Sequence, residues 1–376
     1  VSGWYISQYK PLHQTVIRVN DTNFNMNYYV KMLKYYGEGM PTEYMQFMAD
    51  EVVKVIEQNE LVRQKAMELG ISISDDAVDK ERKSRDPPLS RDYRDPIRTE
   101  MLVSKLHDEY FDQKVPVYAE QRHIMAMLLE SEIQASEIRA ELEQGGSFSE
   151  LASELSLENF SRLSEGDLGW QPKGILPILL GTTILEDYVF GCEVGVLSQA
   201  VYDEARTKNV GYWLIKVLER EEEPKQANVQ VILLGSEEEA QDIRDKLEAS
   251  ADFDKDFADF AKELSHHDAS KANGGDLGWF TPDMASSAID EFVFNYEVEL
   301  GTLSEPIRDE SAITKGGYWL VKVLDKADNR QIEDADRDLL KAELLNEWIE
   351  ALWDDPENIV ESYLDNEQKK WALDRV

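Results

Sequence analysis

The feature that most constrains the fold of this chain is an internal repeat in its second half. Four pairs of matching segments keep one order and are separated by 104 to 109 residues: GDLGW at Gly166–Trp170 and Gly275–Trp279, EDYVF at Glu186–Phe190 and DEFVF at Asp290–Phe294, GYWLIKVLE at Gly211–Glu219 and GYWLVKVLD at Gly317–Asp325, and EIRAEL at Glu137–Leu142 and DIRDKL at Asp242–Leu247. Such self-similarity at a fixed period indicates two copies of one structural module.

Each copy has the same predicted order of elements. A short β-rich run opens it, HIMAMLL in the first copy and VQVILL in the second. Two helices with apolar residues near the helical period follow, then a glycine-rich turn, a short helix and a closing strand, YWLIKVL or YWLVKVL. This order predicts a small module with an antiparallel sheet, and an α+β chain.

The chain outside the repeats is predicted to be helical. Residues 41–69 place most of their apolar side chains on one stripe, and Gly70 is suited to the position after a helix end. Residues 97–111 and 332–353 form further amphipathic segments, and the tail after Pro356 returns to helix.

Composition narrows the functional classes. Lys and Arg number 40 against 76 Asp and Glu, a formal net charge of −36, which repels phosphate backbones and argues against nucleic-acid binding. The single cysteine, Cys192, excludes an intrachain disulfide and a multi-cysteine metal site. His266 and His267 are adjacent and point in different directions, so we expect no metal site there.

The first residues carry a possible membrane signal. The sequence begins at Val1 without a methionine, and Trp4 and Tyr5 are followed by Lys10. Aromatic residues followed by a cation are typical of a membrane interface next to a missing hydrophobic anchor, and equally of an ordinary amphipathic start. Both interpretations stay open.

The second module resembles the parvulin family of peptidyl-prolyl isomerases. Its LSHHDASKANGGDLGWF, the later GTLSEPI and the final GGYWLVKV occur in the order and spacing of that family, and the first module follows the plan more loosely. The two ends of the chain resemble the helical chaperone domain of SurA-type and PrsA-type foldases, with VNDTNFNMNYYV (Val19–Val30) as its entry. The resemblance implies four parts: a helical domain over 1–120, parvulin-like modules over 121–220 and 225–326, and C-terminal helices over 327–376 that pack on the N-terminal domain.

The resemblance also implies site residues. The family's first-strand histidine corresponds to His123 in the first module and Asn228 in the second, and the last-strand histidine corresponds to Trp213 and Trp319. The family's Cys or Asp falls near Glu158 in the first module, and at His267 or Asp268 in the second. Neither module keeps both histidines. The catalytic candidates are therefore His123, His267 and Asp268.

A proline pocket is implied more fully for the second module. Its substrate-binding positions are Leu277, Phe280, Met284, Ile289 and Trp319. Phe280, Met284 and Ile289 could equally belong to the core, and His123 could equally be a hydrogen-bonded strand residue. The first module matches only at Leu168 and Leu185 and has Gln171 in place of an aromatic residue.

Prolyl isomerisation only has to lower a rotation barrier of about 20 kcal/mol, so no metal or other cofactor is expected. By resemblance the chain is an extracytoplasmic, membrane-anchored foldase that binds unfolded or proline-containing polypeptides, with weak or absent isomerase activity. The alternative is a holdase or scaffold without catalysis. A net charge of −36 favours basic clients in either case.

Overall fold

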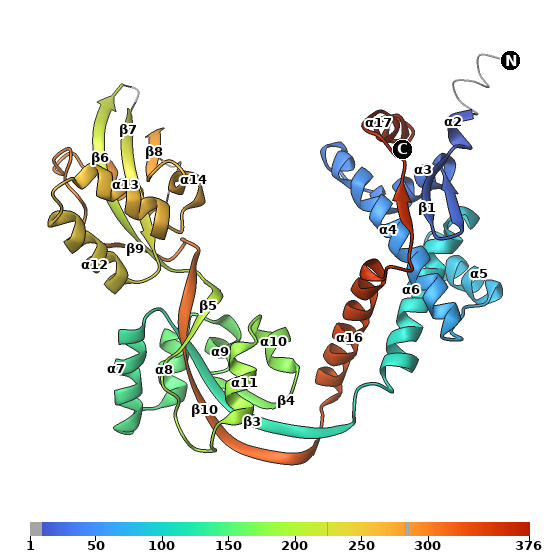
Figure 1. Cartoon of the computed structure of the whole chain (residues 1–376), viewed down its shortest axis with the longest axis horizontal. Coiled ribbons are helices and arrows are strands. Elements are labelled where there is room, and N and C mark those ends of the chain that lie inside the picture. The colour runs from blue at the N-terminus through green and yellow to red at the C-terminus, as the bar shows by residue number, and fades with distance from the viewer. Residues whose placement is uncertain (1–9, 224, 283, 285) are drawn as a thin grey trace. The chain divides into compact units, whose positions relative to one another are not determined.

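The computed structural model describes residues 10–223, 225–282, 284 and 286–376 (Figure 1). The expected membrane-border residues Trp4 and Tyr5 lie outside this part. Among the described residues, no helix is both long and apolar enough to cross a membrane. The chain divides into two compact units, one made of Val1–Val117 and Ile332–Val376 and the other of Tyr118–Gln331.

The first unit is mainly helical and contains both ends of the chain. Its elements are α2 (Lys10–Leu12), β1 (Thr15–Val19), β2 (Thr22–Asn25), α3 (Met26–Gly37), α4 (Thr42–Glu68), α5 (Asp75–Ser84), η2 (Arg91–Tyr93), α6 (Arg94–Lys105), η3 (Leu106–Phe111), α16 (Asp334–Asp354), β11 (Val360–Ser362) and α17 (Asn366–Leu373). A 3-stranded sheet in the order β11-β1-β2 joins the two ends, with Ile17 opposite Ser362. The expectation of a helical domain built from N- and C-terminal segments is confirmed.

Local sequence explains where these helices begin and end. The side chain of Asn25 accepts a hydrogen bond from the Tyr28 backbone N–H and starts α3. Asp365 and Gln368 form a capping box at α17. The helix expected over residues 41–69 is observed as α4, and Gly70 follows with φ +75°. The apolar stripe of α4 packs into one core with α3, α16 and α17.

The second unit contains the two repeats. Its elements are β3 (Tyr118–Leu129), α7 (Glu132–Glu143), α8 (Phe148–Leu155), α9 (Asn159–Leu163), β4 (Asp167–Pro172), α10 (Ile175–Leu180), α11 (Ile184–Gly191), β5 (Val201–Lys208), β6 (Gly211–Glu222), β7 (Lys225–Leu234), α12 (Glu237–Glu248), α13 (Phe253–Leu264), α14 (Asp268–Lys271), β8 (Asp276–Phe280), α15 (Ser287–Val293), β9 (Ile307–Asp309) and β10 (Thr314–Gln331). They form two 4-stranded antiparallel sheets, β4-β3-β10-β5 and β8-β7-β6-β9.

The strand pairing departs from the expected module boundaries, because the two closing strands are exchanged. β10, at the end of the second repeat, lies between β3 and β5 of the first sheet, and Figure 1 shows it running beside β3. β6, at the end of the first repeat, pairs with β7 and β9 in the second sheet. Modules closed by their own strands over 121–220 and 225–326 are therefore not what is observed. The first module consists of 118–208 and 314–331, and the second, 211–309, is inserted into it.

The expected boundary between residues 220 and 225 does not separate two modules. β6 and β7 pair with each other in one sheet, and the last pair in their register joins Glu222 to Lys225. β6 therefore already belongs to the second sheet.

Candidate functional site: the two repeat modules and a groove in the helical unit

His123 lies on the first module's central strand β3, opposite Trp170 on β4 and Asp325 on β10. Its Nε2 is 2.9 Å from Oδ1 of Asp167, and its ring stacks on Trp170 with 5.6 Å between ring centroids. Because a carboxylate can only accept, Nε2 carries the proton. The guanidinium of Arg330 lies 4.5 Å from the Trp170 ring. His123 is thus a half-buried, oriented imidazole next to two acidic residues.

Trp319 belongs to the first module, although it stands in the second repeat. It is fully buried on β10, and its Nε1–H donates to Oδ2 of Asp203 at 3.1 Å. Asp203 on β5 is fully buried too, and among the described residues its Oδ1 has no hydrogen-bond partner. The expectation that Trp319 lines a substrate pocket with Leu277 of the second module is therefore wrong.

The implied proline-ring positions of the first module are filled by its own side chains. Leu168 and Leu185 are buried in one cluster with Trp319, together with Leu176 and Leu180 of α10. Leu168 and Leu185 are 3% and 0% exposed, so these two side chains offer almost no surface to a ligand ring. The first module has an oriented histidine beside a closed core.

Glu158, at the place of the family's Cys or Asp, is occupied by structural contacts. It is buried and caps α9, with Oε2 accepting from the Ser161 backbone N–H at 2.6 Å. Its Oε1 is 3.4 Å from Nη2 of Arg206. Both carboxylate oxygens are thus engaged, which suits a structural role better than proton transfer.

In the second module the polar candidates lie at the start of α14. The Nδ1 of His267 is 2.8 Å from the Ser270 hydroxyl, and burial lowers the pKa of this imidazole. Asp268 is exposed at the first position of the helix. Asn228 occupies the first-strand position on β7, and among the described residues its buried Oδ1 has no partner. His267 and Asp268 belong to one module and His123 to the other, so the structure does not bring the three together.

The apolar candidates of the second module separate into core and surface. Phe280 and Ile289 are 5% and 3% exposed and pack in the sheet core, where Phe280 meets Phe294 edge to face. Leu277 is half-buried beside them. Met284 is 72% exposed. Phe280 and Ile289 therefore pack as core residues, which is one of the two roles, core or proline pocket, that the sequence left open.

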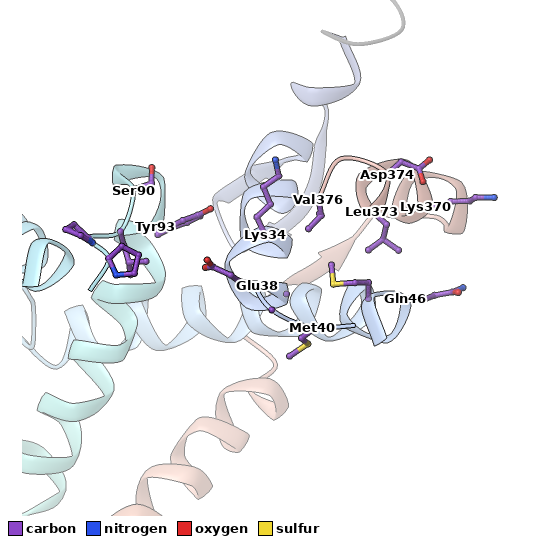
Figure 2. Close-up of a pocket in the computed structure, with 16 residues that line it drawn as sticks. Lys34, Glu38, Met40, Gln46, Ser90, Tyr93, Lys370, Leu373, Asp374 and Val376 are labelled. Atoms are coloured by element: carbon purple, nitrogen blue, oxygen red, sulfur yellow. The ribbon is translucent and has the colours of Figure 1, made fainter. Parts of the chain in front are cut away.

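A separate groove of about 800 Å³ lies in the helical unit (Figure 2). It is lined by residues from the α3–α4 connection, the segment before α6 and the end of α17: Lys34, Gly37, Glu38, Gly39, Met40, Met45, Gln46, Pro87, Pro88, Leu89, Ser90, Tyr93, Lys370, Leu373, Asp374 and Val376. Figure 2 shows Leu373 and Val376 from the C-terminal segment on one side and Tyr93 on the other. The volume lies in the range of ligand pockets, and the walls mix apolar side chains with charged ones, among them Lys34, Glu38 and Asp374.

Exposed apolar side chains lie in and near the groove. Met40 is 44% exposed, and Met45 packs with its thioether against Gly37. Nearby on α4, Tyr44 and Phe47 are 58% and 66% exposed. Methionine side chains adapt to varied partners, and exposed aromatic side chains add large apolar area. Local sequence does not reveal this groove, because its lining comes from three distant segments.

No metal site accompanies these features: within the described residues, no group of three or more His, Cys, Asp and Glu side chains is placed to hold a metal ion.

Comparison with known proteins identifies one protein family and several relatives. The PPIC-type PPIASE domain matches residues 112–221 and again 212–327. Chaperone SurA from Nitrosococcus oceani is 27% identical over 321 residues, covering 73% of this chain and 71% of that protein. Chaperone SurA from Photorhabdus laumondii is 26% identical over 381 residues, covering 86% and 83%. Foldase protein PrsA from Geobacillus kaustophilus is 34% identical over 103 residues, covering 27% and 33%.

Proposed function

Since the chain belongs to the PPIC-type PPIase domain family, with two such domains and a helical unit, we propose that it is an extracytoplasmic foldase that binds unfolded, proline-containing segments of other proteins. The observation that carries the proposal is the groove of the helical unit. Its apolar walls of Met40, Met45 and Leu89 suit varied side chains of an extended polypeptide, and Lys34 and Lys370 add polar contacts.

Isomerase activity is proposed to be weak. The catalyst must hold the proline ring in an apolar pocket and stabilise the twisted amide. His123 is the single histidine of the family pair in the first module, and the core around Trp319 occupies the pocket positions. In the second module Asn228 replaces the histidine, while Phe280 and Ile289 pack in the core.

Client binding is tested by the suppression of aggregation of a chemically unfolded reporter protein. Met40→Glu places a charge at the groove and should abolish most of the suppression. Met67→Glu is the matched control, because Met67 is also exposed, lies on α4 and does not line the groove. Equal activity of the two variants would place the client site elsewhere.

Isomerisation is tested separately by a protease-coupled assay on short X-Pro peptides with the intact chain. We expect a small acceleration that disappears in His123→Ala. A second candidate function, a holdase without catalysis, is favoured by the burial of Trp319 and Asp203, and it is the conclusion if the intact chain gives no acceleration while still suppressing aggregation. A rate typical of an efficient enzyme would contradict the proposed weak activity.

A further inference from the structure

The exchanged strands β6 and β10 are close copies of one sequence. Over Gly211–Glu219 and Gly317–Asp325 they differ at two positions, Ile215 against Val321 and Glu219 against Asp325. Each change conserves the chemical type and alters the side chain by one methylene. The two strands therefore offer nearly the same surface to any sheet that accepts them.

Both strands also meet equivalent partners in the same register. The corresponding pairs are Tyr212↔Leu234 and Tyr318↔Leu129, Leu214↔Ile232 and Leu320↔Met127, Lys216↔Gln230 and Lys322↔Met125, Val217↔Val229 and Val323↔Ile124. A register shift follows at the same place in each, between Val217 and Glu219 and between Val323 and Asp325. On the other edge, Lys216 bridges to Leu303 as Lys322 bridges to Leu197. Because register is matched residue by residue, either strand fits either sheet.

The two connections between the sheets, from β5 to β6 and from β9 to β10, are short and adjacent. β5 ends at Lys208 and β6 begins at Gly211, while β9 ends at Asp309 and β10 begins at Thr314. Lys208 pairs with Thr314, and Gly211 pairs with Asp309, so the two connections run side by side in opposite directions. We call this place the crossing. The hydroxyl of Thr314 donates to the backbone oxygen of Val210 and ties the two connections together.

At this crossing the two repeats differ in their charged residues. Glu130, which follows β3 and is 9% exposed, accepts hydrogen bonds from the Tyr212 hydroxyl at 3.1 Å and from Nη1 of Arg308 at 2.9 Å. The buried ammonium of Lys208 donates to the Glu130 backbone oxygen at 3.0 Å. We call Glu130, Lys208, Tyr212 and Arg308 the crossing cluster. It joins the first module to β6 and β9 of the second.

The equivalent positions elsewhere lack these charges. The counterpart of Glu130 is Gly235, and those of Lys208 and Arg308 are Thr314 and Tyr202. Around Tyr318 the corresponding contact is an aromatic one, with Tyr202 at 5.0 Å between ring centroids. The charged network is therefore present on one side of the crossing and absent at the equivalent positions on the other, and it adds partly buried, charge-assisted hydrogen bonds to the exchanged arrangement.

We propose that β6 and β10 are interchangeable closing strands, so that the chain folds into two strand-pairing isomers: the exchanged isomer described above, favoured by the crossing cluster, and a tandem isomer in which β6 closes on β3 and β10 on β7. Interconversion requires both strands to leave their sheets, so the proportion of the isomers is set during folding. The overlap of the two family matches at residues 212–221, within β6, agrees with a strand that fits either module.

The isomers are distinguished by engineered disulfides in the full-length chain with Cys192→Ser. Met125→Cys with Lys322→Cys joins β3 to β10 and reports the exchanged isomer. Met125→Cys with Lys216→Cys joins β3 to β6 and reports the tandem isomer. Directly opposed antiparallel residues lie about 4.5–5.5 Å apart at Cα, within disulfide reach. Met125→Cys with Lys246→Cys on α12 is the background control.

Each variant is refolded from urea, oxidised mildly and mapped by mass spectrometry of unreduced peptides. We expect the β3–β10 bond in most molecules and the β3–β6 bond in a minority well above the background control. Glu130→Ala, or Arg308→Gln from the other side, should raise the β3–β6 fraction several-fold. Glu141→Ala, at an exposed site on α7, should leave the fraction unchanged.

Three results would overturn the proposal. A β3–β6 bond that never exceeds background would show that the strands are not interchangeable. The β3–β6 bond alone would show that the exchanged isomer is not formed. Disulfides that link two chains would place the exchange between copies of the protein rather than within one.

Discussion

Glu57 is a carboxyl group in the core of the helical unit, and it makes stability depend on pH. It lies on α4, is 6% exposed, and has no hydrogen-bond partner among the described residues. Burial disfavours the charged form and raises the pKa of Glu57 from 4.5 to about 7. The folded state therefore binds more protons than the unfolded state between these values, and stability falls as the pH rises through them.

The size of the effect follows from the two pKa values. The contribution of Glu57 to stability is full below pH 4.5, declines up to about pH 7 and changes little above it. Linkage gives a loss of about 2.5 kcal/mol in the free energy of unfolding between pH 5 and pH 8. Glu57→Gln removes the titration, so this variant should gain about 2.5 kcal/mol relative to the parent over that range.

The assay is urea unfolding at pH 5, 6, 7 and 8, followed by ¹⁹F NMR of protein labelled with fluorotryptophan. Trp348 packs against Phe111 in the helical unit and reports on that unit alone. Glu68→Gln is the control, because Glu68 lies on the same helix with its side chain 64% exposed and should show no such difference. If Glu57→Gln and the parent lose stability in parallel from pH 5 to pH 8, the inference from burial is wrong.

Three further predictions concern the second unit and the charge of the chain. Trp319→Phe keeps most of the side-chain volume but removes the donor to buried Asp203, so urea unfolding should show a free energy of unfolding lower by about 1–3 kcal/mol. The control Trp279→Phe, at an exposed position, should lower it by under about 0.5 kcal/mol. Equal losses would contradict the burial of Trp319. Gly275→Ala should lower the thermal midpoint of unfolding much more than Gly278→Ala. Both glycines have positive φ, but an added Cβ would lie 2.7 Å from the Val231 backbone oxygen at Gly275 and would meet nothing within 4 Å at Gly278. Similar shifts in the two variants would refute this steric argument. Binding of a basic unfolded peptide should weaken steeply between 50 and 500 mM salt because screening removes attraction to a chain of net charge −36, and fluorescence anisotropy that is independent of salt would contradict this.

The local sequence pattern was sufficient to predict the helices, the strands and the fold class. The period of residues 41–69 and the glycine-rich turns act over a few residues, and the corresponding helix and turns are observed. The repeat likewise predicted two similar sheets. Such signals are read from neighbouring residues, so they do not depend on which distant segment completes a sheet.

The candidate site was predicted less well, for two physical reasons. Phe280 and Ile289 have the residue types of both a proline pocket and a sheet core, and packing against Val217 and Val229 decides for the core. The groove of the helical unit depends on Met40, Leu89 and Leu373 coming together from distant segments. Neither outcome leaves a periodic signal in the sequence.

The exchange of closing strands exposes a limit of assigning functional residues one repeat at a time. Nearly identical closing strands fit both sheets, so the choice falls to a few residues that differ at the crossing, Glu130 and Arg308 among them. That choice then decides which residues face the catalytic candidate. In the observed pairing His123 stands opposite Asp325 rather than Glu219, and the closed core beside it is completed by Trp319 rather than Trp213. A substitution in β10 therefore acts first on the module that begins at β3, although the sequence assigns it to the module that begins at β7.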